Sequence, residues 1–546
     1  FYGIDDVFIN YAYTIKPDGE IVDAREYGIQ NYAKEYPDYK AFQFFTMTMP
    51  SLQKGSILEF QILITSREPK AKGMFFDSYQ PRRFLPVIKS SYSLNVPSDL
   101  NVRYLRFNTP VDVQEAPQDA GRKIYQFSMN LRPGVKPEPG MPSERESMGE
   151  VILSTSKSWD EIAQWWHDLI KDKSNVSAEI QSHVDDLIKN TVDVREKIRK
   201  INFDVADNIR YVGFNFGHSI YEPADATTVF KNKYGDCKDQ SMLLLAMLKA
   251  AGINAHTALA SSGLGLKVQT DIPTLSEFNH VIVVAEDGKE KYFLDPTLKQ
   301  YPFGVLPAWL ENRQIMHVKE GKAVFEDIPM SNYQSNRIDT AVNLEFDSKL
   351  NLHGTMVINW FGQSNGNIRQ ILYQLVSPKQ KEEFVDTILK GIYSYARRDS
   401  YEFVSDENVD LPLTLKLSFH MHNWLLEAGA GQYLLHLYGG DIEVPSYLGK
   451  NRKFPVRVNE SNKQSLHVSI KIPDNFDVEI PPPFDLAHEY QQNHVHYKFE
   501  NHILTLDQEI LNLKGDIPLD QIDSLRSAWE SIAQANRKGV LLKPKR

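Results

Sequence analysis

The stretch "YGDCKDQSMLLLAMLKAAG", Tyr234 to Gly252, decides how the centre of this chain folds. It holds the only cysteine of the sequence, Cys237, between two aspartates at the start of an apolar run. From Met242 to Ala251 nearly every residue is apolar. A helix that is apolar on almost all sides is normally buried in the middle of a domain. We therefore predict a central helix around which the rest of a domain packs.

The two ends of this predicted helix place Cys237 at its first residue. Asp236 is a favourable N-cap and Asp239 lies in the first turn, while Gly252 suits the left-handed position that ends a helix. The unpaired amides and the positive dipole end of a helix favour an anion, and the thiolate is the nucleophilic form of cysteine. The position suits a nucleophile. The alternative is a small, buried, inert side chain.

A hairpin is predicted downstream, in "EFNHVIVVAEDGKEKYFLDPT", residues 277–297. Asp287-Gly288 is a strong two-residue turn signal. If these two residues form the loop, Glu286 pairs with Lys289, and their opposite charges support that register. The same register continues to the open end of the hairpin, where it brings two further polar residues face to face.

These two residues are His280 and Asp295, whose Cβ atoms would lie about 5 Å apart on one face of the ribbon. A carboxylate beside a histidine orients the ring and stabilises its cationic form. An ordinary polar pair between strands is the alternative. Together with Cys237 upstream, the order Cys, His, Asp is typical of a site with a thiol nucleophile.

These motifs resemble the bacterial transglutaminase-like superfamily over roughly residues 205–310. The resemblance is carried by the cysteine stretch, by "FNHVIVV" and "FLDPT", and by "IRYVGFNFG", "EPADATTVFKNKYGDCKD" and "PFGVLPAWL". It implies a papain-related α+β core in which Cys237 is the nucleophile, His280 the general base and acid, and Asp295 the residue that orients the imidazole. It also implies a β-sandwich domain before the core and another β domain after it.

Members of this family usually supply a donor for the oxyanion from the strand before the cysteine. In "NIRYVGFNFGH" the resemblance makes Tyr211 a candidate, with Asn215 behind it. The tryptophan that the animal enzymes have for this role is absent, which counts against the assignment. The backbone amide of Cys237 is the other donor that this arrangement offers.

The pattern of the whole chain predicts a multidomain protein with an α+β transglutaminase-like core between two β-sandwich-type domains. Its length of 546 residues suggests three or four domains. Short alternating runs predict a β-sandwich over 1–148, helical spacing and a mixed pattern predict the core over 149–325, and alternation returns over 326–546. Two helical stretches, 366–378 and 379–396, interrupt the last region.

Composition excludes several classes of partner. The net charge of −10 argues against a nucleic-acid ligand, and no apolar stretch approaches 18 residues, so we expect no membrane span. No calcium-loop pattern is present, and we expect neither a metal nor a cofactor. The chain begins at Phe1, which suggests either that a targeting segment has been removed or that the sequence has simply been trimmed. The resemblance implies a periplasmic or cell-surface location and a partner in the cell envelope.

The predicted function is amide hydrolysis or acyl transfer on a peptide or protein, through a thioester on Cys237. The alternative is a catalytically silent binding or scaffold protein of the cell envelope. The long connection 261–279 is expected to line the cleft, or else to be a disordered insertion. The pairs His420/His422 and His494/His496 share strand faces, and solvated polar pairs are a simpler explanation for them than metal ligands.

Overall fold

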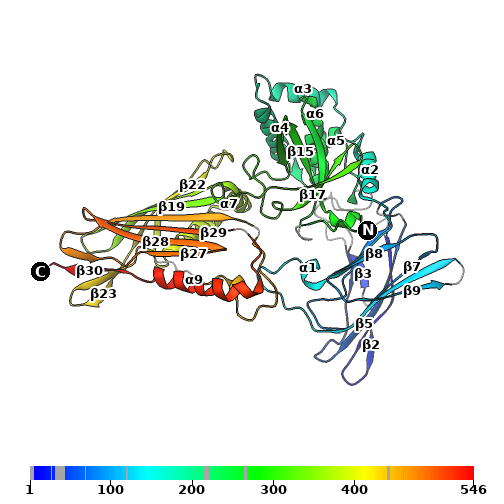
Figure 1. Cartoon of the computed structure of the whole chain (residues 1–546), viewed down its shortest axis with the longest axis horizontal. Coiled ribbons are helices and arrows are strands. Elements are labelled where there is room, and N and C mark those ends of the chain that lie inside the picture. The colour runs from blue at the N-terminus through cyan, green and yellow to red at the C-terminus, as the bar shows by residue number, and fades with distance from the viewer. Residues whose placement is uncertain are drawn as a thin grey trace.

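A computed structural model of the chain describes residues 5–25, 27–30, 44–67, 69, 71–118, 121–213, 220–262, 267–438, 443–458, 460–513 and 515–545. Three regions follow one another along the chain (Figure 1): an N-terminal β region, a central region rich in helices, and a long C-terminal β region. In the central region, five described α-helices accompany a single five-stranded sheet. This region therefore carries the predicted α+β core.

The N-terminal region contains two three-stranded sheets that pack face to face, of order β7-β10-β9 and β6-β11-β8. Their shared core is aromatic, with Tyr125 and Phe127 fully buried. The described strands here are β1 Asp5–Ile15, β2 Ile21–Asp23, β3 Tyr27–Gln30, β4 Phe44–Met47, β5 Ile57–Ser66, β6 Phe76–Tyr79, β7 Val87–Pro97, β8 Arg103–Phe107, β9 Asp112–Gln118 and β10 Arg122–Arg132. This arrangement is the sandwich that the alternating pattern predicts.

The segment that follows β10 is still hydrogen-bonded to the strands of the sandwich. After helix α1, Glu144–Met148, strand β11, Glu150–Ser154, pairs with both β6 and β8. The N-terminal sheets therefore extend to Ser154, beyond the predicted boundary at residue 148. A long Pro- and Gly-rich segment precedes β11. No local pattern in the sequence indicates which domain this strand joins.

The central region is a five-stranded antiparallel sheet of order β16-β15-β14-β17-β18 with helices on it. Its described elements are α2 Trp159–Ile170, α3 Ala178–Leu187, α4 Val194–Asn208, β12 Arg210–Tyr211, α5 Ala226–Asn232, β13 Tyr234–Gly235, α6 Cys237–Ala250, β14 Asn254–Ala260, η3 Leu275–Glu277, β15 His280–Asp287, β16 Glu290–Leu294, β17 Gln314–Lys319 and β18 Lys322–Asp327.

Helix α6 is the central element of this region, as its apolar sequence predicts. Every residue from Lys238 to Leu248 is buried. The helix contacts β14 and β15 on one side and α3, α4 and α5 on the other. Its first residue is Cys237, and Gly252, just beyond its end, has a φ of +71°. The capping signals in the sequence therefore locate both ends of the helix correctly.

The hairpin β15–β16 differs from the predicted register by two residues. Glu286 pairs with Lys291 rather than Lys289, and the loop is Gly288-Lys289. Gly288 has a φ of +60°, so the glycine occupies the first central position of the turn instead of the second. Because strand side chains alternate with a period of two, this shift leaves every residue on its predicted face.

The C-terminal region is built from an eight-stranded sheet and a four-stranded sheet that share one core with helix α8. The sheet orders are β21-β22-β20-β19-β25-β29-β28-β27 and β23-β24-β30-β26. The described elements are β19 Arg337–Phe346, β20 Leu352–Trp360, α7 Gly362–Gln374, α8 Pro378–Ile392, β21 Arg397–Val404, β22 Leu413–Met421, β23 Leu426–Gly429, β24 Gln432–Leu435, η4 Ser446–Leu448, β25 Asn462–Lys471, β26 Phe476–Glu479, β27 Phe484–His488, β28 Gln491–Glu500, β29 Ile503–Asn512, η5 Leu519–Gln521, α9 Ile522–Asn536 and β30 Val540–Pro544.

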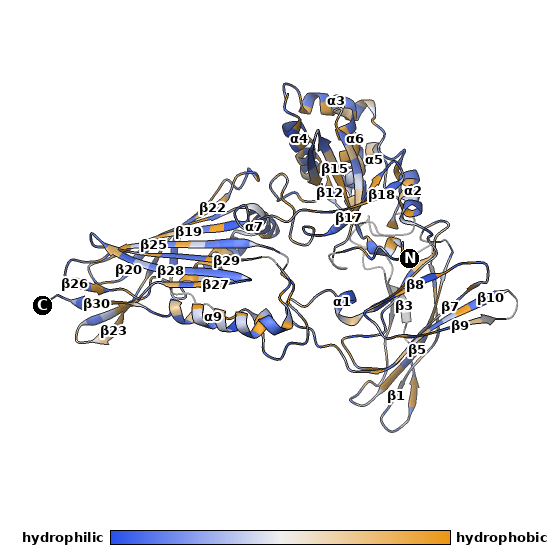
Figure 2. Ribbon diagram, in the orientation of Figure 1, coloured by the Kyte–Doolittle hydropathy of each residue, from blue (hydrophilic) through white to orange (hydrophobic). Residues whose placement is uncertain are grey.

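Helix α9 lies along the eight-stranded sheet near β27 and β28 and carries both hydrophobic and hydrophilic residues (Figure 2). Its apolar side chains, among them Leu525, Trp529 and Ile532, are buried in a small core of their own. Among the residues that the structure describes, no helix combines the length and apolarity needed to cross a bilayer.

Candidate active site

Cys237 is held at the start of α6 by a reciprocal capping arrangement. The Asp236 carboxylate accepts hydrogen bonds from the backbone amides of Lys238 and Asp239, at 3.1 and 3.3 Å. The Asp239 carboxylate in turn accepts one from the amide of Asp236, at 3.1 Å. A Cβ on Gly235 would lie only 2.6 Å from that of Asp239. Only glycine therefore permits this approach of the chain to the helix.

The imidazole and carboxylate come from the same end of the hairpin. His280 is the first residue of β15, and Asp295 directly follows the last residue of β16. His280 Nε2–H donates to Asp295 Oδ2 at 2.7 Å. The other oxygen, Asp295 Oδ1, accepts from the amide and the hydroxyl of Thr297, at 3.0 and 2.7 Å. The side chain of Asp295 has no exposed surface, so its orientation is fixed from both sides.

A buried serine hydroxyl connects the first turns of α6 to strand β15 of the hairpin. Ser241, one turn after Cys237, donates from Oγ to the main-chain oxygen of Val281 at 3.2 Å. Val281 follows His280 directly, and the Cys237 side chain lies close enough to the His280 ring to help raise its pKa. Because Nε2 of that ring is engaged by Asp295, Nδ1 is the atom left for the thiol. The three predicted residues therefore lie together in the predicted order.

The contacts among Cys237, His280 and Asp295 determine the protonation states of the imidazole and the carboxyl group. Burial alone would lower the pKa of His280, but the charge and hydrogen bond of Asp295 and the contact with Cys237 outweigh it and raise the pKa to about 10. Burial would raise the pKa of Asp295, yet the His280 charge and the Thr297 bonds hold it below its usual range. At neutral pH the pair is thus an imidazolium and a carboxylate.

A cavity of about 70 Å³ opens beside the half-buried Cys237. Its wall is mostly apolar and aromatic and is formed by Trp166, Ile220, Tyr221, Cys237, Lys238, Leu259, Leu275, Phe278, Asn279, His280 and Val281. Three of these residues belong to the connection 261–279, which agrees with the expectation that this connection lines the cleft. The cavity gives a small apolar group access to the thiol.

Tyr211, the candidate oxyanion donor, is not among the residues that line this cavity. It lies in the two-residue strand β12 and is 55% exposed. Asn215 lies outside the described residues. Tyr221 lines the cavity instead, and burial raises the pKa of its hydroxyl to about 12, so it remains a donor at neutral pH. No periodic signal surrounds this tyrosine in the sequence, so no pattern predicts its place in the cavity.

Trp309 is a second residue that the motifs did not single out. Its ring meets the ring of His280 edge to face, with centroids 5.4 Å apart and planes at 74°. It shields one side of the imidazole, although the residue itself is 38% exposed. The only signal in the sequence was its place in "PFGVLPAWL", after Asp295.

The N-terminal region supports the wall of the cavity through a buried ion pair. Arg145 of α1 donates from Nη1 to Glu277 at 2.6 Å and from Nε to Glu150 at 2.5 Å. All three residues are buried. Glu277 lies between Leu275 and Phe278, which both line the cavity. The N-terminal region thus fixes a segment that borders the thiol.

Comparisons with known proteins fit this geometry. Residues 4–136 match the family described as a domain of unknown function, DUF3857, and residues 181–267 match the transglutaminase-like superfamily. A crystal structure of a "putative protease" from Parabacteroides distasonis aligns with 99% of this chain and 89% of its own, at 14% identity and a TM-score of 0.68. At that identity, the likeness shows a shared fold.

A second crystal structure, of a "putative cysteine protease" from Cytophaga hutchinsonii, aligns with 41% of this chain and 78% of its own, at 13% identity. Its TM-score of 0.19 carries no structural argument. No curated protein matches the chain.

Proposed function

Because the chain has a transglutaminase-like core preceded by a DUF3857 domain, we propose that it is a thiol-dependent amide hydrolase or acyltransferase that acts on peptides or proteins. The observation that carries this proposal is the single imidazole shared by Cys237 and Asp295 beside a cavity. A thiol, a base and an orienting carboxylate in that order are the components of acyl transfer through a thioester.

In the first half of the reaction, the thiolate of Cys237 attacks the amide carbonyl carbon and forms the C–S bond. The negative charge that develops on oxygen is stabilised by the backbone amide of Cys237 at the helix start, with the Tyr221 hydroxyl as a second donor. His280 then gives its Nδ1 proton to the amide nitrogen, the C–N bond breaks, and an amine leaves.

In the second half, the neutral His280 accepts a proton from water or from an acceptor amine as that group attacks the thioester carbonyl. The C–S bond breaks, which restores the thiolate and the imidazolium together with an acid or a new amide. Asp295 keeps the ring in one orientation throughout and stabilises its cation. Trp309 covers one side of the ring, which limits the access of water to the imidazole.

The cavity indicates which substrate group binds beside the thiol. Its apolar wall, formed in part by Leu259, Leu275 and Phe278, suits a small aliphatic side chain of the substrate. The size of about 70 Å³ excludes a large aromatic ring unless the wall moves. We therefore propose that peptides with a small apolar residue next to the scissile amide are preferred.

The test is a reaction of the whole protein with a mixture of peptides, followed by mass spectrometry, with and without hydroxylamine. Hydrolysis gives new carboxyl ends, while transfer gives hydroxamates on the same acyl group. Both products should disappear in Cys237→Ser. Identical product patterns for the wild type and Cys237→Ser would favour the silent scaffold, as would a Cys237 that iodoacetamide does not label in the folded protein.

We further propose that the protein acts in the periplasm or at the cell surface, with a partner in the cell envelope. A single cysteine is compatible with this location, because it leaves no thiol with which Cys237 could form an internal disulfide. Fractionation of cells that express the natural gene would test the proposal. Recovery of the protein with the cytoplasmic fraction would contradict it.

A further inference from the structure

A second group of chemically active side chains lies on the eight-stranded sheet of the C-terminal region, far along the chain from Cys237. His494 and His496 are two residues apart on β28, so both point to the same face. Asp485 on β27 is paired directly with His494 and therefore shares that face. Strand pairing alone brings two imidazoles and one carboxylate to a single place.

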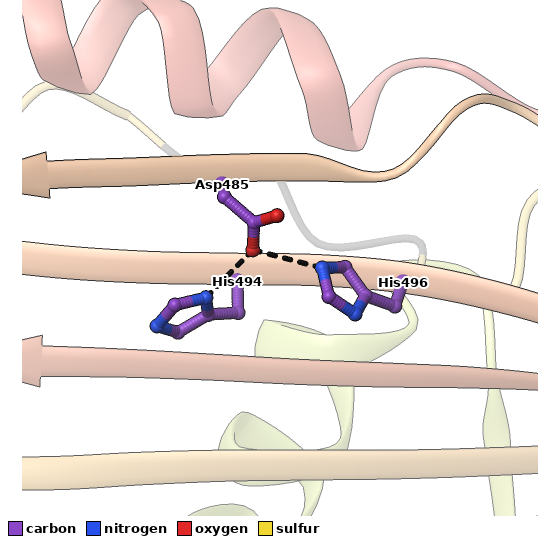
Figure 3. Close-up of side chains that lie close together, drawn as sticks. All are labelled: Asp485, His494 and His496. Carbon is purple, nitrogen blue, oxygen red and sulfur yellow. Dashed lines mark hydrogen bonds and ion pairs between the residues drawn. The ribbon is translucent and has the colours of Figure 1, made fainter.

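These three side chains converge on one oxygen atom (Figure 3). His494 Nδ1–H donates to Asp485 Oδ1 at 2.7 Å, and His496 Nε2–H donates to the same oxygen at 2.8 Å. The candidate ligand atoms all lie within 4.8 Å of one another. Among the described residues, no other group of three or more His, Cys, Asp or Glu side chains converges in this way.

We propose that Asp485, His494 and His496 form a binding site for a divalent transition metal ion, with Zn²⁺ as the preferred occupant. Two imidazole nitrogens and one carboxylate oxygen are ligands that Zn²⁺ accepts, at about 2.0–2.2 Å, whereas Ca²⁺ and Mg²⁺ prefer oxygen ligands alone. The spacing of the two histidines in the sequence reveals no acidic ligand beside them, and β27 supplies one, Asp485.

To admit the ion, the three ligand atoms, which lie within 4.8 Å of one another, have to rearrange around it. Tetrahedral bonds of that length separate neighbouring ligand atoms by about 3.3 Å. The two nitrogens are now 2.7 and 2.8 Å from Asp485 Oδ1, so each has to move outward by about half an ångström. The ion takes the place of both N–H protons. Each neutral ring then carries its proton on the outward nitrogen, Nε2 of His494 and Nδ1 of His496.

The surroundings provide an open coordination position and a second layer of polar groups. A cavity of about 550 Å³ lies over this face of the sheet, and His494, His496 and Asp507 are among the residues that line it. Asp507 is paired with His496 on one side and with His467 on the other, and His467 Nδ1–H donates to it at 2.6 Å. Three protein ligands leave a fourth position for water or an anion from the cavity.

The test is titration of the full-length, tag-free protein with Zn²⁺ by isothermal calorimetry. All variants carry Cys237→Ser, so that the thiolate of the other site cannot bind the metal. We expect one Zn²⁺ per chain, and an affinity that is at least tenfold lower in Asp485→Asn and in the double variant H494Q/H496Q. All three side chains are largely exposed, so these variants are expected to fold.

The double variant H420Q/H422Q is the matched control. It removes another pair of histidines that lie two residues apart on a strand. His420 contacts a carboxylate, that of Asp399, at 2.6 Å. Among the described residues, however, this pair does not form a group of three ligands. The affinity of the control variant should stay within twofold of the parent. The visible absorption of the Co²⁺ form should likewise be lost in Asp485→Asn and retained in the control.

Three results would overturn the proposal: no Zn²⁺ binding by the Cys237→Ser parent, binding that neither Asp485→Asn nor H494Q/H496Q weakens, or a Co²⁺ spectrum that Asp485→Asn leaves unchanged.

Discussion

Ser241 Oγ lies 3.2 Å from the main-chain oxygen of Val281, and this hydrogen bond joins the cysteine helix to the histidine strand. Ser241 is fully buried and one helical turn from Cys237, while Val281 is the neighbour of His280. The bond therefore sets the spacing between nucleophile and base. Ser241 is not among the residues that line the cavity, so it acts as a positioning residue.

Replacing Ser241 with alanine should loosen this contact. We expect a loss of about 1–2 kcal/mol in the free energy of unfolding, because a buried acceptor loses a donor. Labelling of Cys237 by iodoacetamide near neutral pH should slow severalfold, since the thiol and imidazole are less well aligned. The matched control is Ser531→Ala, which removes an exposed hydroxyl bonded to the carbonyl of its own helix. Equal effects of the two changes would contradict the positioning role.

Asp295→Asn keeps the shape of the side chain and removes its charge. The raised pKa of His280 should fall, because the carboxylate is a main cause of that shift. Turnover of a peptide substrate should drop about a hundredfold or more, while the protein remains folded. The pH dependence of Cys237 labelling reports the change. Asp287→Asn, at the exposed end of the same hairpin, is the control and should leave both measurements unchanged.

The same pair predicts how stability depends on pH. A pKa raised from 6.5 to about 10 in the folded protein means that the imidazolium stabilises the fold fully below about pH 6.5. This contribution is lost as the pH rises through about 10. The melting temperature of the wild type should exceed that of His280→Gln at pH 6, and the difference should shrink by pH 10.5. A difference that grows with pH would contradict the assignment.

Gly235→Ala tests the approach of the chain to the helix start. The new Cβ would lie 2.6 Å from that of Asp239, so the capping pair must separate. We expect a loss of about 1–3 kcal/mol in stability and slower labelling of Cys237. Gly391→Ala is the contrasting control, because a Cβ there meets no atom within 4 Å and lies in helix α8. That change should leave stability equal or up to about 1 kcal/mol higher.

Much of the candidate site could be predicted because its signals are local. Asp236 and Gly252 mark the two ends of α6, and a run of apolar residues shows that the helix is central. His280 and Asp295 are not directly opposite each other in the observed register, but their side chains still meet, since a shift of two residues preserves the faces of a strand. The dipeptide Asp287-Gly288 does not reveal which of its residues begins the loop.

Other features depend on contacts that no local pattern encodes. The resemblance makes Tyr211 a candidate because it lies in the strand before the cysteine helix, yet a two-residue strand shows no periodicity from which the direction of its side chain can be read. Tyr221 enters the cavity from an irregular segment. Asp485 meets His494 across a hairpin whose turn, at Glu489-Tyr490, has none of the usual turn residues, so its register could not be read.

The buried contact between Arg145 and Glu277 has a consequence for how this molecule can be divided. A core excised without the sandwich would leave Glu277 as an interior charge that lacks its cation, and burial already raises the pKa of this carboxyl. The loop that borders the thiol would then lose its anchor. The central region therefore depends on Arg145 of the N-terminal region to hold the segment that borders Cys237, and the two are best expressed together.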